Sequence, residues 1–278
     1  MNPAYDDLER PPLDAAALNR ALTGPESGWR EVRVVPETAS TNSELARLAR
    51  EGAGPGLVLV AEHQTAGRGR LDRAWTSPPG AGLTFSVLVE PAGVPPEYWP
   101  WVPLLAGVAV AEGVRRVTEV DASLKWPNDV LVGDRKLAGL LAERVEAPNA
   151  SLAVVGVGLN VTLRAAELPT AEATSLALEK AATTDRTVVL REVLRVFDRL
   201  FREWLREGGD PRAGLRESYL RRCSTLGRRV RVALPAGGGL VGEAVRVDDH
   251  GRLVVRTDAG EQVVGAGDVV HVRATDPD

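Results

Sequence analysis

Short runs of apolar residues recur along the first two thirds of the chain, at the spacing that is typical of β-strands. They predict strands at residues 32–35, 57–61, 83–89 and 152–161. Two more runs, at 130–131 and 137–145, flank Gly133-Asp134 like the arms of a hairpin. A β-sheet is therefore expected in this part of the chain.

Apolar residues at helical spacing lie between and after these strands. Thr41-Asn42-Ser43-Glu44 has the form of a capping box and predicts a helix through about residue 50, after a short amphipathic stretch at 13–22. Residues 102–117 are rich in alanine and valine, which indicates a buried helix. Helices at 189–207 and 211–222 are expected to cover one face of the sheet.

After Gly227 the pattern changes to short β segments separated by glycine-rich turns. The turns fall at residues 237–239, 250–251 and 265–267, and the last apolar segment runs over 269–272. This pattern predicts a small β-barrel, with its boundary near Thr225. We therefore divide the chain into a short N-terminal segment (1–30), a catalytic domain (31–225) and a C-terminal β domain (226–278).

Composition and charge exclude several classes of protein. The chain of 278 residues has 38 acidic and 34 basic residues, a net charge of −4, so no global field attracts nucleic acid or membrane. No apolar run approaches the roughly 18 residues of a membrane span, and the first residues do not resemble a signal peptide. We expect a cytoplasmic protein. The single cysteine, Cys223, has no partner for an internal disulfide.

Glycines alternate with arginines in a polar loop that follows the second predicted strand. Gly67 and Gly69 would let the backbone approach a ligand closely, while Arg68, Arg70 and Arg73 carry planar forks that suit phosphate or carboxylate. The segment thus favours an anion-binding loop. Taken alone, it is equally compatible with a solvated loop in which the arginines are incidental.

Three further segments bring polar side chains together with glycine or proline. They are Lys125-Trp126-Pro127-Asn128-Asp129, Arg135-Lys136-Leu137-Ala138-Gly139 and Gly156-Val157-Gly158-Leu159-Asn160. The last is a poor dinucleotide fingerprint, because it has no third glycine or helix start in the required place. Structural alternatives stay open: Lys125 as an ion-pair partner, Trp126 and the Trp75 that follows the loop as core residues, and the glycines of the last segment as packing positions in a strand.

Together with Ser40-Thr41-Asn42, these segments resemble the ordered signature of the biotin-protein ligase family. The order is Ser-Thr-Asn, Gln-Thr-Ala-Gly-Arg-Gly-Arg, Lys-Trp-Pro-Asn-Asp, Arg-Lys-Leu-Ala-Gly and Gly-x-Gly-Leu-Asn, all in register between Ser40 and Asn160. The resemblance implies an α+β fold: a mixed β-sheet with helices on one side, similar to class II aminoacyl-tRNA synthetases, and a C-terminal SH3-like β-barrel. Asp72 departs from the family pattern, which usually has glycine there.

The resemblance also implies an activity and its partners. Such enzymes use ATP and Mg²⁺ to form biotinyl-5′-AMP, and then transfer biotin to a lysine of the biotin carboxyl carrier domain of a biotin-dependent carboxylase. The chain has no helix-turn-helix segment before Glu31, so it resembles the monofunctional ligases and is not expected to bind DNA. A homodimer is expected because family members are often dimers. The alternative activity is that of a lipoate-protein ligase.

Site residues follow from the resemblance position by position. Lys136 would bridge the biotin carboxylate and the α-phosphate of ATP, with Arg68 and Arg70 on the phosphates, and Asp129 would ligate Mg²⁺ or assist the incoming amine. The implied biotin site comprises Ser40, Thr41, Asn42, Gln64, Gly67, Arg68, Lys136 and Gly139. The implied ATP site comprises Arg68, Arg70, Arg73, Trp75, Lys125, Asn128, Lys136 and Asn160.

Overall fold

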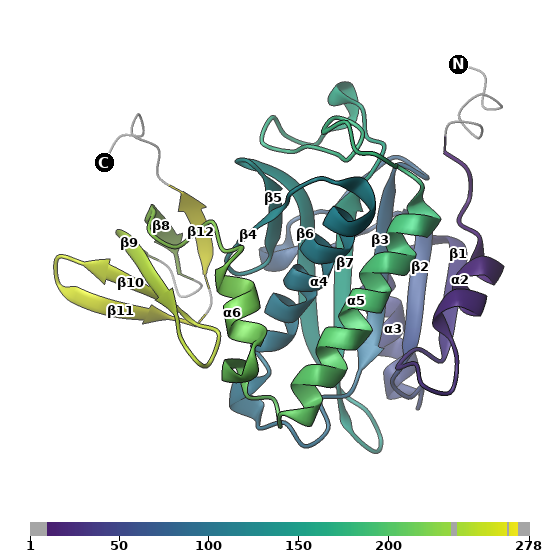
Figure 1. Cartoon of the computed structure of the whole chain (residues 1–278), viewed down its shortest axis with the longest axis horizontal. Coiled ribbons are helices and arrows are strands. Elements are labelled where there is room, and N and C mark those ends of the chain that lie inside the picture. Colours follow the sequence, from purple (N-terminus) through teal and green to yellow (C-terminus); the bar gives the residue numbers. More distant parts are fainter. Residues whose placement is uncertain (1–9, 235–237, 266, 272–278) are drawn as a thin grey trace.

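The structure is a computed structural model that describes residues 10–234, 238–265 and 267–271. Its larger part is a seven-stranded sheet in the order β1-β2-β3-β7-β6-β5-β4 (Figure 1). β1 and β2 are parallel, and the other neighbours are antiparallel, so the predicted mixed sheet is confirmed. The strands are β1 (Glu31–Thr38), β2 (Leu57–Gln64), β3 (Gly82–Val89), β4 (Ser123–Lys125), β5 (Asp129–Val132), β6 (Arg135–Glu146) and β7 (Ser151–Asn160).

Helices cover both faces of this sheet, which corrects the expectation of helices on one side. α4 (Trp101–Thr118) and α5 (Arg186–Arg206) lie against each other on one face and enclose the main core (Figure 1). α3 (Thr41–Arg50) packs on the opposite face, where its Leu45 and Ala49 form a second apolar cluster. Because successive strand residues point to opposite faces, a strand such as β3 contributes to both clusters.

The N-terminal segment belongs to the main core. α2 (Ala15–Leu22) packs against α5 and β1, and its Leu18 and Leu22 are buried there. α2 begins after Asp14, whose carboxylate accepts a hydrogen bond from the backbone N–H of Ala17.

The start of α3 differs by one residue from the predicted capping box. The N-cap is Ser40, whose hydroxyl accepts from the N–H of Ser43 at 3.4 Å. Glu44 instead lies in the first turn, where its charge favours the helix N-terminus, and it pairs with Arg47 at 2.8 Å. The predicted helix is confirmed, and its cap places Ser40 and Thr41 at the end of the sheet.

A second, antiparallel sheet of five strands follows, as the glycine-punctuated pattern predicted. Its order is β11-β10-β9-β8-β12, so β11 and β12 form its two edges. Parts of the predicted turns at 237–239 and 265–267, and Val272 of the last predicted segment, lie outside the described residues. The strands are β8 (Arg229–Ala233), β9 (Gly239–Val247), β10 (Leu253–Thr257), β11 (Gly260–Val264) and β12 (Asp268–His271).

Two buried tryptophans fix the second sheet against the first. The indole N–H of Trp101 donates to the carbonyl of Asp249 at 2.8 Å, and that of Trp126 donates to the carbonyl of Gly251 at 2.9 Å. Trp126 therefore lies in the core, as the structural alternative had it. Its hydrogen bond holds the segment 125–129 beside the C-terminal sheet. This docking brings β12 close to the ends of β4 and β5.

Two elements differ from the predictions. β4 has only three residues and was not predicted, and the helix expected over 211–222 is a single turn at Pro211–Ala213 followed by α6 (Leu215–Leu220). Gly214 separates these two parts with a φ of 121°, a backbone conformation that favours glycine. Among the described residues, no helix is long and apolar enough to cross a membrane.

Candidate active site

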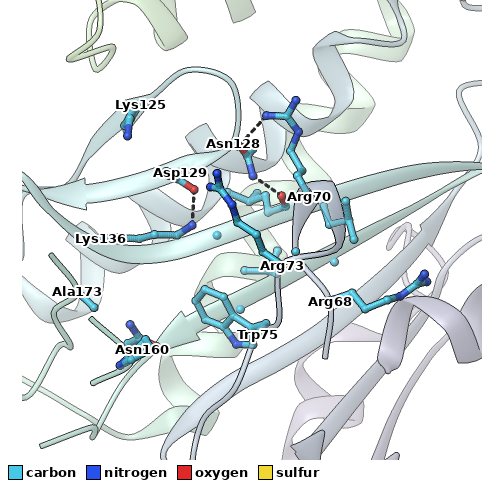
Figure 2. A pocket seen from close by; sticks show the side chains of 18 of the residues that line it. Arg68, Arg70, Arg73, Trp75, Lys125, Asn128, Asp129, Lys136, Asn160 and Ala173 are labelled. Atoms are coloured by element: carbon cyan, nitrogen blue, oxygen red, sulfur yellow. Dashed lines mark hydrogen bonds and ion pairs between the residues drawn. The ribbon is translucent and has the colours of Figure 1, made fainter. Parts of the chain in front are cut away.

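A cavity of about 640 Å³ opens at one end of the large sheet, where all five of the sequence motifs meet. Every residue that we predicted for the site lines this cavity except Gly67. Figure 2 shows Lys136, Asp129 and Arg73 pointing toward one another, with Trp75 beside them. The predicted residues in its lining are Ser40, Thr41, Asn42, Gln64, Arg68, Arg70, Arg73, Trp75, Lys125, Asn128, Asp129, Lys136, Gly139 and Asn160.

Lys136 and Asp129 form an ion pair inside the cavity. The Nζ atom of Lys136 lies 2.6 Å from Oδ1 of Asp129 and 5.8 Å from the centroid of the Trp75 ring (Figure 2). The backbone of Lys136 is held on both sides, because its N–H donates to the carbonyl of Glu172 and its carbonyl accepts from the N–H of Thr174. Pairing with β5 and a bridge to the segment 172–174 thus hold the backbone from which this side chain enters the cavity.

The floor of the cavity consists of bare backbone beneath an indole. A methyl group at Gly158 would lie 2.2 Å from Cε2 of Trp75, and one at Gly139 would lie 3.1 Å from Nζ of Lys136. The indole Nε1 of Trp75 is buried and has no hydrogen-bond partner among the described residues. Glycine is therefore needed at position 158 so that the indole can lie on the strand, and the bare backbone of Gly139 leaves space beside the end of Lys136.

We expect Gly158→Ala to displace Trp75 and weaken nucleotide binding. A methyl group at 2.2 Å from a ring that is packed on the sheet has to move the ring, since overpacking of this kind costs about 1–3 kcal/mol. The KM for ATP should rise about tenfold while the fold is retained. Steady-state kinetics with varied ATP measure this effect, and an unchanged KM would show that the position of Trp75 does not matter.

Hydrogen-bonding groups are concentrated at the end of the cavity beside α3. Both the N–H and the hydroxyl of Thr41 donate to Oε1 of Gln64, at 2.7 Å and 3.0 Å. Ser86, which is fully buried on β3, lies 2.7 Å from the Thr41 hydroxyl and 2.6 Å from Oδ1 of Asn42. Ser86 was not predicted, because a single serine in an apolar strand gives no signal in the sequence.

Gly67 lies at the base of the polar loop 64–73, which we call the glycine-arginine loop. The carbonyl of Gly67 accepts from the N–H of Trp75, and a methyl group at Gly67 would lie 2.4 Å from the carbonyl oxygen of Trp75. Gly67 therefore permits the two arms of the loop to pair, and its contact with biotin stays a prediction. The side chain of Asp72 lies outside what the structure describes.

The arginines of this loop point in different directions. NH1 of Arg70 donates to Oδ1 of Asn128 at 3.3 Å and to the carbonyl of Gly267 at 3.0 Å, so this side chain links the loop to the C-terminal sheet. Arg73 reaches toward the Lys136 and Asp129 pair, whereas Arg68 extends away from it (Figure 2). Two arginines of the loop thus lie over the cavity, and the third lies beside α3.

The two asparagines predicted for the ATP site are fixed by backbone carbonyls. The amide of Asn128 donates to the carbonyl of Leu140 at 2.8 Å, and that of Asn160 donates to the carbonyl of Thr174 at 2.9 Å. Asn128 follows a cis peptide between Trp126 and Pro127. Both amides are therefore held in defined orientations at the cavity wall.

The C-terminal sheet contributes residues that sequence reasoning missed. Arg228 and His271 line the cavity; Arg228 pairs with Asp134 at 2.8 Å, and Nε2 of His271 lies 3.1 Å from the hydroxyl of Thr225. Burial, together with the nearby charges of Lys125 and Arg228, lowers the pKa of His271 to about 4. These residues lie far from the motifs along the chain and have no distinctive spacing.

The depressed pKa of His271 predicts a loss of stability in mild acid. The folded protein protonates His271 only near pH 4, whereas an unfolded histidine is protonated near pH 6.5. The neutral histidine therefore contributes its full stability to the fold above pH 6.5, and this stability is lost as the pH falls toward 4. The melting temperature of His271→Gln should therefore fall less than that of the wild type between pH 7 and pH 5. Equal losses in thermal melts of the two proteins would refute this assignment.

Comparison with known proteins identifies the family. Residues 33–160 match the biotin/lipoate A/B protein ligase family, and residues 225–272 match the biotin protein ligase C-terminal domain. The chain is 44% identical to the biotin--[acetyl-CoA-carboxylase] ligase of Mycobacterium tuberculosis, over 96% of this chain and 98% of that protein. The chain belongs to the biotin protein ligase family. The resemblance inferred from the five motifs is confirmed.

Other members of the biotin protein ligase family agree in sequence and in fold. The bifunctional ligase/repressor BirA of Bacillus subtilis is 32% identical over 83% of this chain and 71% of that protein. The biotin protein ligase of Aquifex aeolicus, solved in complex with biotin and ATP, is 29% identical, with a TM-score of 0.73 over 88% of this chain and all of that chain. The comparisons support a biotin ligase over the lipoate-protein ligase alternative.

Proposed function

We propose that this protein is an ATP-dependent biotin protein ligase whose site residues act as described below. The observation that carries the proposal is that one cavity holds Lys136 together with a cluster of hydrogen-bonding groups beside α3 and the arginines of the loop. Biotin has a polar ureido head, an apolar body and a terminal carboxylate. A cavity with polar groups at one end and cations further along suits such a molecule.

Formation of the adenylate requires that two anions approach each other. The biotin carboxylate attacks the α-phosphorus of ATP, and pyrophosphate leaves, so negative charge accumulates at the reacting centre. Lys136 would bridge the carboxylate and the α-phosphate, with Arg70 and Arg73 above it. Asp129, at 2.6 Å from Nζ of Lys136, orients this lysine before the ligands bind.

Biotin would lie with its ureido ring at the end beside α3. Ser40, Thr41 and Gln64 supply the hydrogen bonds there, and the bare backbone of Gly139 lets the bicyclic body lie on β6. This orientation places the valerate carboxylate near Lys136.

ATP would occupy the other side of the cavity. The Trp75 ring offers a face for adenine, and Asn160 and Asn128 offer amides at the wall. Lys125 lies near Arg228 and His271, and this group suits the β- and γ-phosphates that leave as pyrophosphate. The C-terminal sheet would thereby take part in nucleotide binding.

The residues present fit a Mg²⁺ ion that arrives with ATP. Mg²⁺ is usually bound by one or two carboxylates together with phosphates and water. Asp129 is the carboxylate that faces the reacting centre, and the described residues contain no cluster of three or more metal-ligating side chains that would hold the ion alone. When bound, the ion would offset the charge of the phosphates.

The second half-reaction transfers biotin to a lysine amine. The neutral amine attacks the carbonyl carbon of the mixed anhydride, and AMP leaves with the electron pair of the broken C–O bond. We propose that the acceptor lysine belongs to the carrier domain of a biotin-dependent carboxylase, because the Mycobacterium tuberculosis relative is named for acetyl-CoA carboxylase. The homodimer, the cytoplasmic location and the domain boundary near Thr225 stay predictions.

Biotin-dependent exchange of label between pyrophosphate and ATP tests the first half-reaction. We expect exchange with biotin and none with lipoate, since the polar end of the cavity matches the ureido ring. Exchange with lipoate but not with biotin would refute the proposed substrate, and exchange with neither would refute the proposed activity.

A further inference from the structure

Arg68 is held outside the group of cations that faces the reacting centre. Its NH2 donates to the hydroxyl of Ser43 on α3 at 2.9 Å and lies 3.7 Å from Oε1 of Glu143 on β6. Figure 2 shows the side chain extended away from Lys136 and Asp129. In this arrangement Arg68 connects the first half of the loop to α3 and β6.

Glu143 is itself held in place by a buried hydrogen-bond chain. Its Oε2 accepts from the amide of Asn42 at 2.7 Å, and the same amide donates to the carbonyl of Leu141. The other atom of that amide, Oδ1, accepts from Ser86 at 2.6 Å. Both amide hydrogens of Asn42 are therefore used within the protein, which favours a positioning role for this residue over contact with biotin.

The buried chain of hydrogen bonds requires glycine at position 156. A methyl group at Gly156 would lie 2.1 Å from Oδ1 of Asn42, so only glycine at this position leaves room for the amide. Asn42 is 4% exposed and Ser86 is fully buried, whereas the Glu143 carboxylate reaches a small open hollow of about 360 Å³ that Arg68, Arg70 and Leu71 also line. A rigid, buried support thus presents one carboxylate to the loop.

We propose that Glu143 is a positioning residue that tethers the glycine-arginine loop through Arg68. The tether fixes the half of the loop at Arg68, so that Arg70 and Arg73 in the other half lie over the cavity. Its catalytic consequence, retention of the adenylate, rests on the proposed function. The tether itself is a property of the ligand-free protein and can be measured without catalysis.

Limited proteolysis of the ligand-free protein tests the tether directly. Trypsin can cut after Arg68, Arg70 or Arg73, and Glu143→Gln removes the charge while it keeps an oxygen for the Asn42 amide. Because exposed ion pairs are weak, we expect cleavage within this loop to become about two- to fivefold faster. Mass spectrometry of the fragments identifies the cut sites, and unchanged cleavage would overturn the proposal.

A matched control lies on the same strand. Glu146→Gln removes an exposed carboxylate that pairs with Arg144 at 2.7 Å and does not line the cavity. This variant should be cut in the loop at the wild-type rate. Higher salt should speed cleavage of the wild type and of Glu146→Gln, but should have little effect on Glu143→Gln, because salt screens the ion pair.

A double-mutant cycle then relates the tether to function. Arg68→Gln and Glu143→Gln should each release adenylate about two- to fivefold faster, and the double variant should be no worse than either single one. Independent, multiplying effects would show that Arg68 acts on the ligand without Glu143 and would overturn the proposal. A wild type that makes no adenylate would refute the proposed function, whereas the proteolysis result would still decide the tether.

Discussion

We expect Lys136→Ala to reduce biotin-dependent ATP/pyrophosphate exchange about 10²- to 10³-fold. The lysine offsets charge that grows as the carboxylate meets the α-phosphate, so its loss affects the transition state more than the bound ground state. Its backbone bonds to Glu172 and Thr174 do not involve the side chain, and the fold should therefore persist. Exchange kinetics and circular dichroism of the same preparation measure the two effects.

Arg135→Gln is the matched control for this variant. Arg135 is the adjacent residue, it is exposed, and it pairs with Glu179 at 2.8 Å outside the cavity. Loss of a cation at this position should leave exchange close to the wild-type rate. If Lys136→Ala exchanged as fast as Arg135→Gln, Lys136 would have no part in the mechanism.

Arg70→Gly should separate formation of the adenylate from its retention. Arg70 joins the loop to Asn128 and to the carbonyl of Gly267, and in the proposed function it contacts the phosphate of the intermediate. Such a charge-assisted contact contributes about 1.5–3 kcal/mol, so its loss should speed escape of the adenylate about ten- to a hundredfold. Lys136 and Arg73 remain, so the adenylate should still form.

Bystander labelling measures this escape. Free biotinyl-adenylate acylates exposed lysines without regard to sequence, so an unrelated protein mixed with the variant, ATP and biotin should become biotinylated far more than with the wild type. Arg70→Lys keeps the charge without the planar fork and should lie between the two. A variant that forms adenylate and retains it as firmly as the wild type would exclude Arg70 from the loop's closing role.

The strands and helices with a clear period could be predicted from the sequence. β3 and β7 carry long apolar runs, and α4 was predicted to within one residue at each end. β4 could not be predicted, because three residues are too few to show alternation. The placement of α3 on the opposite face of the sheet also has no local signal, since it follows from how the strands cross over.

The site was predictable where its residues cluster in short motifs. Lys136, Asp129 and Arg70 belong to three such motifs, and the fold brings them to one cavity. Ser86, Glu143 and His271 escaped prediction because each is an isolated residue whose role depends on a distant partner. The family resemblance implied similar roles for Arg68 and Arg70, and only the structure separates their directions (Figure 2).

Attachment of biotin to a carrier lysine changes the mass of the carrier domain, which mass spectrometry measures. A carrier domain from a biotin-dependent carboxylase, incubated with the protein, biotin, ATP and Mg²⁺, should gain the mass of one biotinyl group at a single lysine. A carrier in which that lysine is replaced by arginine should gain none, and omission of ATP should abolish the change. A carrier that keeps its mass under the complete conditions, with a protein that is folded, would contradict the account.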